Sequence, residues 1–171
     1  GGVMALFDGA PTGREFGKFV QDAKVNVLGV VPSLVRAWRD QDCMSGLDWS
    51  AIKLFSSTGE VSNREDMHYC MSLGGGKPII EYCGGTEIGG GCISSVVTRP
   101  IVLATFNTLS PGMNAYILND QAEVSDRGEM FLCPPSIGLS HTLLNKDHHQ
   151  TYFAETPAGP RGEKLRRHGD Q

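Results

Sequence analysis

The stretch from Pro78 to Gly91, PIIEYCGGTEIGGG, decides how the rest of the chain is interpreted. Its apolar start predicts a buried strand, and the glycine pair Gly84-Gly85 permits backbone dihedral angles that other residues avoid. The hydroxyl of Thr86 can donate to a phosphate oxygen, and the carboxylate of Glu87 can bind a hard cation such as Mg²⁺. Open α/β sheets bind ligands at the carboxyl ends of their strands, so the stretch predicts a ligand site. On these residues alone, a plain strand that ends in a glycine turn is the alternative.

The residues before this stretch alternate between strand and helix patterns. Apolar runs predict strands at 3–7, 25–31, 52–55 and 78–82, and helical spacing predicts helices at 15–24, after Pro32, and at 64–73. Ser33 and Asn63 are expected to cap the second and third helices. This order predicts an α/β fold, a parallel sheet with flanking helices.

The pattern changes near Ser94-Ser95, where we expect a subdomain boundary that separates residues 1–94 from 95–171. Short strand candidates follow at 96–97, 101–106, 115–118, 129–133 and 164–167, and one helix is expected at 145–153. Turn residues rather than helices separate most of these strands. The second part is therefore predicted to be a mostly antiparallel β subdomain that resembles a distorted barrel.

Composition excludes several classes of protein. The 171 residues are 40% hydrophobic and 20% charged, as in ordinary globular proteins, and the net charge of −4 gives no electrostatic reason to expect a nucleic-acid partner. No apolar run approaches the ~20 residues of a membrane-spanning helix. The five cysteines include no Cys-x-x-Cys pair, so they predict reduced intracellular thiols rather than a zinc site or disulfide framework.

Three motifs, in the same order, resemble those of the adenylate-forming superfamily, which includes acyl-CoA synthetases, luciferases and the adenylation domains of peptide synthetases. The segment from Cys83 to Glu87 is similar to its Tyr-Gly-x-Thr-Glu motif, with Ser57 to Glu60 before it and Arg167 to Asp170 after it. The match is to the acetyl-CoA synthetase-like branch, and especially to plant-type acyl-activating enzymes. It implies that the chain is a fragment of the large N-terminal domain, with a Rossmann-like half followed by the barrel-like subdomain.

The resemblance implies two walls of an adenine slot. One wall would be formed by a segment after the third strand, namely Gly59, Glu60 and Val61. Five residues ahead of Thr86 would also bind the nucleotide, the last three of them as the opposite wall: Glu81, Tyr82, Cys83, Gly84 and Gly85. Cys83 stands where many relatives carry an aromatic residue, and Val61 replaces a proline.

The same resemblance implies the catalytic and metal-binding roles. Thr86 would bond the α-phosphate of ATP, Glu87 would hold Mg²⁺, and Asp170 would accept hydrogen bonds from the ribose hydroxyls. The chemistry needs such groups, because a substrate carboxylate attacks the α-phosphorus while both partners are anionic. Arg166 and His168 depart from the usual aromatic residue and threonine of the ribose motif.

The implied activity is that of an ATP-dependent acyl-CoA ligase, which forms an acyl-adenylate with release of pyrophosphate and then transfers the acyl group to CoA. Gly84 replaces the tryptophan of acetate-specific members, so the acid is expected to be larger than acetate. The upstream phosphate loop and the C-terminal lid domain are not matched, and this segment alone is not expected to turn over. The partners would be small molecules, in a peroxisomal or cytoplasmic enzyme. A carrier-protein or amine acceptor, or a non-catalytic nucleotide-binding module, remains the alternative.

Overall fold

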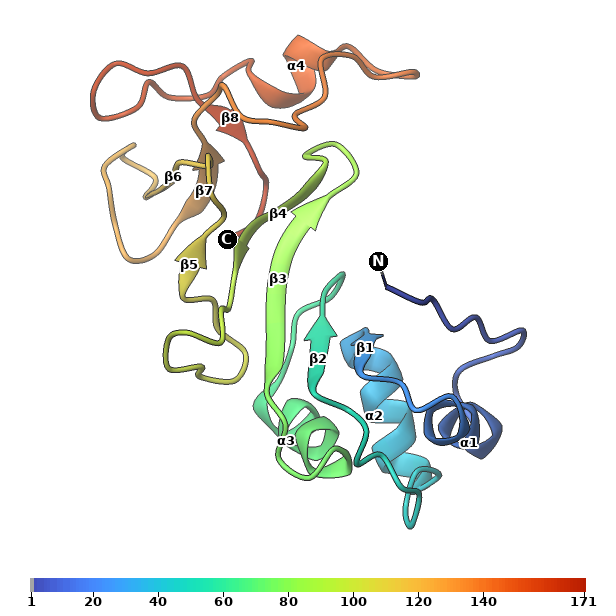
Figure 1. Ribbon diagram of the computed structural model, residues 1–171. Helices are drawn as coiled ribbons and strands as arrows, with labels where there is room; N and C mark the ends of the chain where they lie inside the picture. The colour runs from blue at the N-terminus through green and yellow to red at the C-terminus, as the bar shows by residue number, and fades with distance from the viewer. Residues whose placement is uncertain (1) are drawn as a thin grey trace. The chain divides into compact units, whose positions relative to one another are not determined.

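The computed structural model describes residues 2–171, which divide into two compact units (Figure 1). Unit 1 contains the residues up to Cys83 together with Ile93–Thr108, and unit 2 contains Gly84–Cys92 together with Leu109–Gln171. The chain passes between the units inside three strands of one sheet. The predicted single boundary near Ser94-Ser95 stays a prediction.

Unit 1 has the predicted alternation of helices and strands. In chain order the elements are α1 (Arg14–Asp22), β1 (Val27–Val30), α2 (Pro32–Gln41), β2 (Leu54–Ser57), α3 (Arg64–Leu73) and β3 (Ile79–Gly85). The strands β1, β2 and β3 pair in parallel, with Val27 opposite Leu54 and Ser57 opposite Glu81. The α/β fold and the cap of α3 by Asn63 are confirmed, since the Asn63 side chain accepts a hydrogen bond from the Asp66 N–H.

Aromatic side chains fill the core of unit 1. Trp38 stacks on Phe16 at 5.7 Å between ring centroids and meets Trp49 edge to face at 5.8 Å. Each indole N–H donates to a backbone carbonyl, because a buried donor without an acceptor is costly. Met67 and Cys70 are fully buried on α3, as the apolar stripe of that helix predicts.

Three strand predictions in this unit are wrong. Residues 3–7 form no strand; Val3, Met4 and Leu6 are largely exposed. Residues 96–97 and 101–106 form a loop, because side chains take the backbone groups that a strand partner would use. Asn107 accepts from the Val96 N–H at 3.0 Å, and the Ser95 hydroxyl donates to the Thr105 carbonyl at 2.9 Å.

The remaining elements are β4 (Gly90–Ser94), β5 (Thr108–Leu109), β6 (Ala115–Leu118), β7 (Glu129–Leu132), α4 (His148–Tyr152) and β8 (Arg166–Arg167). Strands β4 and β5 extend the first sheet, whose order is β1-β2-β3-β4-β5. The strands β6, β7 and β8 form a separate antiparallel sheet. The second part is thus mostly antiparallel, as predicted, and the described residues form a three-stranded sheet without a closed barrel.

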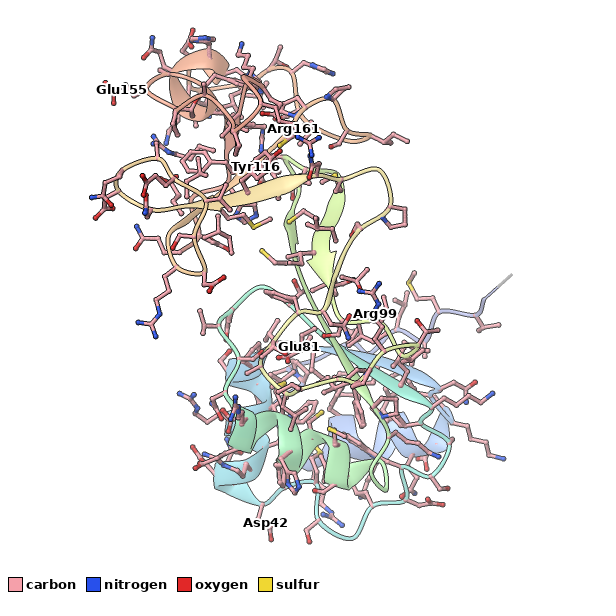
Figure 2. All side chains as sticks on the ribbon, turned by 90° about the vertical axis from the view of Figure 1, so that its left-hand side faces the viewer. Asp42, Glu81, Arg99, Tyr116, Glu155 and Arg161 are labelled. Atoms are coloured by element: carbon pink, nitrogen blue, oxygen red, sulfur yellow. The ribbon has the colours of Figure 1, made fainter. Side chains whose placement is uncertain are left out.

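Unit 2 has a small core that holds its loops to this sheet. Leu118, Phe131, Cys133 and Leu165 form it. The hydroxyl of Tyr116, which Figure 2 labels, donates to the Glu163 carboxylate at 2.8 Å. This bond fastens the loop before β8 to β6. This bond raises the pKa of Tyr116 and lowers that of Glu163. The described residues include no helix long and apolar enough to cross a membrane.

Candidate functional site

The segment predicted as one wall of the adenine slot follows β2 in unit 1. Gly59 has φ of +88°, a left-handed conformation that favours glycine. Both carboxylate oxygens of Glu60 accept hydrogen bonds from Ser33, one from its N–H at 2.8 Å and one from its hydroxyl at 2.7 Å. Val61, the next residue, is 94% exposed. The segment thus presents an apolar side chain to solvent beside a carboxylate that is already bonded.

The Glu60–Ser33 contact changes the electrostatics of the segment. Hydrogen bonds from the Ser33 side chain and backbone lower the pKa of Glu60, and the Arg36 charge adds a smaller effect in the same direction. Ser33 therefore does not cap α2 as predicted. The N-cap of α2 is Val31, and Ser33 lies in the first turn, where it donates to Glu60.

A buried ion-pair cluster holds α3 against α2 behind this segment. Asp66 is fully buried and pairs with Arg36 at 3.1 Å and with Arg39 at 2.8 Å. It also bonds Asn63, the N-cap of α3. The helices on both sides of the 59–62 segment are therefore fastened to each other.

Glu81, predicted to bind the nucleotide, is 3% exposed in β3 (Figure 2). Its carboxylate accepts from the Ala104 N–H at 2.5 Å, and its carbonyl accepts from the Ser95 N–H at 2.7 Å. Glu81 thus fastens the loop that residues 95–107 form. Its role in nucleotide binding stays a prediction. Tyr82, the next residue, is 36% exposed, and Cys83 is half-buried.

The predicted phosphate and metal ligands lie on the turn between β3 and β4. The strand β3 runs through the glycine pair rather than ending at it, and residues 86–89 make the turn. A Cβ atom on Gly84 would lie 2.0 Å from the Gly90 carbonyl oxygen, so the close approach of the two backbones requires glycine there. Thr86 is exposed at the first turn position. Its side chain is accessible to a ligand.

Glu87 is held in the turn by its backbone. Its carbonyl accepts from the Ser140 N–H at 2.8 Å and from Arg166 Nη2 at 3.4 Å. Its carboxylate lies above Gly85, where both oxygens would be 2.5 Å from an added Cβ atom. Glycine at 85 therefore leaves space for the carboxylate of Glu87. A single carboxylate fits Mg²⁺ when phosphate and water oxygens supply the other ligands.

Arg166 connects β8 to this turn within unit 2. The side chain is 1% exposed, and its guanidinium lies over the Tyr152 ring, 3.8 Å from the centroid. It also donates to the Ser140 hydroxyl at 3.3 Å. His148 is half-buried, and its Nε2 atom lies 2.8 Å from the Ser140 carbonyl oxygen. Sequence reasoning missed Ser140 because no motif includes it.

Asp170, the predicted ribose ligand, follows β8. Its carbonyl accepts from the Met130 N–H at 2.9 Å, which continues the pairing of β8 with β7. Its carboxylate is 67% exposed and lies 3.5 Å from His168 Nδ1. Unit 2 thus contains the predicted ribose ligand and the predicted phosphate ligands Thr86 and Glu87, with β8 fastened to the turn through Arg166.

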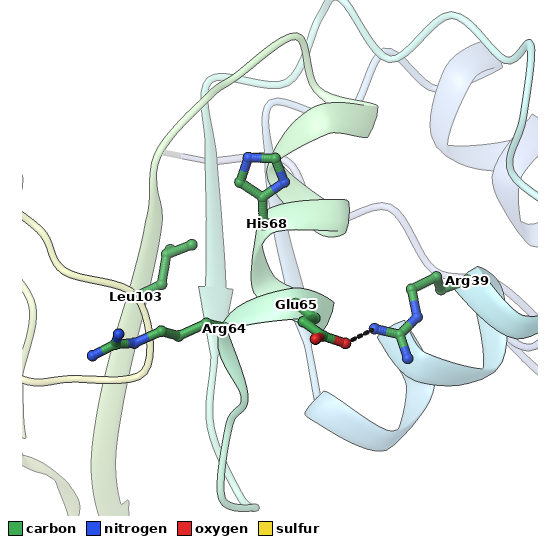
Figure 3. Close-up of a pocket in the computed structure, with 5 residues that line it drawn as sticks. All are labelled: Arg39, Arg64, Glu65, His68 and Leu103. Carbon is green, nitrogen blue, oxygen red and sulfur yellow. Dashed lines mark hydrogen bonds and ion pairs between the residues drawn. The ribbon is translucent and has the colours of Figure 1, made fainter.

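Two hollows in the units lie away from most of the predicted residues. One, of about 600 Å³, is lined by Arg39, Arg64, Glu65, His68 and Leu103 (Figure 3). Ion pairs at its edge already use Arg39. The other, of about 520 Å³, lies in unit 2, and its lining includes Arg167, the first residue of the ribose motif, and Gln171, which follows the motif.

Comparison with known proteins gives relatives along nearly the whole chain. The chain is 47% identical over 175 residues to the probable acyl-activating enzyme 17, peroxisomal, of Arabidopsis thaliana, and 45% identical over 175 residues to hexanoyl-CoA synthase of Cannabis sativa. Each match covers 99% of this chain and 24% of the relative, so the chain spans about a quarter of the length of these proteins. No family model matches the chain.

Solved structures give the same fold at low identity. The anthranilate CoA ligase AuaEII in complex with anthranoyl-AMP is 19% identical with a TM-score of 0.78, over 96% of this chain and 31% of that one. Acetoacetyl-CoA synthetase from Streptomyces lividans is 20% identical with a TM-score of 0.74, over 90% of this chain and 25% of that one.

The fold is therefore that of the adenylate-forming enzymes, as the motifs predict. Over the part of their length that it spans, the chain is similar in sequence to acyl-activating enzymes and acyl-CoA synthetases.

Proposed function

We propose that the full-length protein is an ATP-dependent acyl-CoA ligase. It converts a carboxylic acid and ATP into an acyl-adenylate and pyrophosphate, and CoA then displaces AMP to give the acyl-CoA. The observation that carries the proposal is the arrangement of the predicted ligands within unit 2. An exposed threonine and a glutamate lie on one tight turn, and β8, which leads to Asp170, is hydrogen-bonded to that turn through Arg166. Relatives named for this activity support it.

Different residues of this chain would contact the phosphate, the ribose and the adenine of the nucleotide. Thr86 would donate to the α-phosphate, and the Asp170 carboxylate would accept from both ribose hydroxyls. Gly59 and Val61 would lie along the adenine ring, and Cys83, Gly84 and Gly85 would also bind the nucleotide. The neutralisation of charge on the transferring phosphoryl group accelerates such reactions.

A magnesium ion bound with ATP would neutralise phosphate charge. Glu87 would hold it, because its carboxylate is the acidic group on the turn and its backbone is fixed from two sides. Phosphate and water oxygens would complete the coordination.

The acid substrate is proposed to be larger than acetate. Gly84 has no side chain, so it would not close an acyl pocket as the tryptophan of acetate-specific members would. The relative named hexanoyl-CoA synthase supports a medium-chain acid. Relatives named as peroxisomal likewise support a peroxisomal location.

The test is a pyrophosphate-release screen of the full-length protein with ATP, Mg²⁺ and a panel of acids from acetate to long-chain and aryl acids. We expect release with hexanoate or a larger acid to exceed release with acetate at least tenfold. A preference for acetate would contradict the substrate proposal, and no release with any acid would contradict the proposed activity.

A further inference from the structure

Helix α2 starts without a cap from its own sequence. The N-cap residue is Val31, whose side chain has no oxygen, and Pro32 at the next position has no N–H group. The Ser33 N–H is therefore the first backbone donor of the helix that needs an acceptor. The cap has to come from elsewhere in the chain.

Glu60 supplies this cap from 27 residues further along the chain. Its two carboxylate oxygens accept from the Ser33 N–H at 2.8 Å and the Ser33 hydroxyl at 2.7 Å. A negative charge at a helix N-terminus is also favoured by the helix dipole. The geometry is bidentate, so the carboxylate is fixed in both position and orientation.

The segment that contains Glu60 is fastened at a second helix start. Asn63 caps α3 by accepting from the Asp66 N–H at 2.9 Å. The chain turns at Gly59, where φ is +88°, directly before Glu60, and carries the exposed Val61 between the two caps. Two capping residues only three positions apart therefore leave this short segment little freedom to move.

We propose that Glu60 is a positioning residue for the nucleotide: through Ser33 it holds Gly59 and Val61 in place against the adenine ring and does not itself contact the nucleotide. The inference rests on the proposed function. The two hydrogen bonds from Ser33 fix the carboxylate toward α2, and a shift toward the exocyclic amine of adenine would weaken them, which favours positioning as the use of this side chain. Glu60 therefore acts through its contact with Ser33 and not through a contact with the nucleotide.

The test measures KM for ATP, KM for CoA and kcat in the full-length protein for Glu60→Ala, Ser33→Ala and the double variant. Each hydrogen bond to the charged carboxylate holds the segment in place, and its loss is expected to raise KM for ATP by up to about tenfold. We expect Glu60→Ala to raise KM for ATP about tenfold and Ser33→Ala about threefold to tenfold, with KM for CoA unchanged. Because both changes break the same contact, the double variant should equal Glu60→Ala alone.

Two control variants separate positioning from general stability. Ser33→Thr keeps the hydroxyl and the N–H and should restore the wild-type KM for ATP. Glu15→Gln removes an exposed acid from the first turn of α1 and should leave all constants unchanged. If Glu60→Ala fails to fold, Ser33→Ala and Ser33→Thr still decide the outcome.

A direct nucleotide contact by Glu60 would leave the KM of Ser33→Ala at the wild-type value, and the proposal would be wrong. Effects that add in the double variant, or a fall in melting temperature with no change in KM, would also overturn it. Calorimetric titration of the same variants with AMP gives a readout that does not need turnover. If the wild-type protein binds AMP but activates no acid, the proposed function fails, and the order of AMP affinities still tests the role of Glu60.

Discussion

Arg166 Nη2 lies 3.4 Å from the carbonyl oxygen of Glu87, although 79 residues separate the two in the sequence. The same guanidinium bonds Ser140 and lies over the Tyr152 ring. The Ser140 N–H reaches the same carbonyl oxygen. The backbone of the proposed metal ligand is therefore fixed by residues of β8 and of the loop before α4, and not by its own turn alone.

Arg166→Met should raise the Mg²⁺ concentration for half-maximal activity about threefold to tenfold, because one hydrogen bond to Glu87 is lost. A titration of activity with Mg²⁺ at saturating ATP measures this. Arg161→Met, a change of the same type at an exposed arginine, should have no effect. A lower melting temperature with an unchanged Mg²⁺ requirement would limit Arg166 to a structural role.

Asp170→Ala should raise KM for ATP by at least tenfold, because two charged hydrogen bonds of about 1.5–3 kcal/mol each would be lost. Steady-state kinetics with varied ATP measures the change. Asp126→Ala, which removes an exposed aspartate from the turn before β7, is the matched control. Equal KM values for the two variants would contradict the proposed ribose contact.

Asp66→Ala should destabilise the folded chain by about 1.5–3 kcal/mol, because it removes the hydrogen bonds that Arg36, Arg39 and Asn63 make to a fully buried carboxylate. Urea unfolding followed by tryptophan fluorescence measures this, since Trp38 lies in the same core. Asp40→Ala removes an exposed partner of Arg39 and should cost less than about 1 kcal/mol. A loss of similar size in the two variants would show that burial of the ion pair contributes nothing.

Gly84→Ala should lower both stability and activity, because its Cβ atom would clash with the backbone oxygen of Gly90. Thermal unfolding and the pyrophosphate assay check the two effects. Gly76→Ala is a control for the loss of a glycine, since no atom lies within 4 Å of an added Cβ there, although its φ of +81° adds strain. Wild-type behaviour of Gly84→Ala would mean that the hairpin has more room than its geometry indicates.

Burial raises the pKa of the Cys70 thiol to about 12. The folded state therefore favours the protonated thiol, and its contribution to stability is fully present below the ordinary thiol pKa of about 8.5 and is lost as pH rises toward 12. At pH 8 we expect iodoacetamide to modify the partly exposed Cys43 much faster than Cys70, as measured by peptide mass spectrometry. Equal rates would mean that α3 opens readily.

Local patterns predicted the parts of the fold that depend on neighbouring residues. Asn63 caps α3 because the cap and its donor are three residues apart, whereas β3 continues through the glycine pair beyond the predicted end of the strand at Tyr82. The predicted strands at 96–97 and 101–106 failed because Asn107 and Ser95 bond that backbone from outside any local pattern. At the site, the motifs identified Thr86, Glu87 and Asp170 as candidates, whereas Ser33 and Ser140 became visible only through contacts between distant segments.

The most direct test of the central claim is to identify the products that the full-length protein forms from ATP, Mg²⁺ and hexanoate in the absence of CoA. Mass spectrometry should detect hexanoyl-AMP with an equal amount of pyrophosphate, and Thr86→Ala should abolish both. Formation of ADP and inorganic phosphate, or the absence of any acyl-adenylate with every acid tried, would contradict the account.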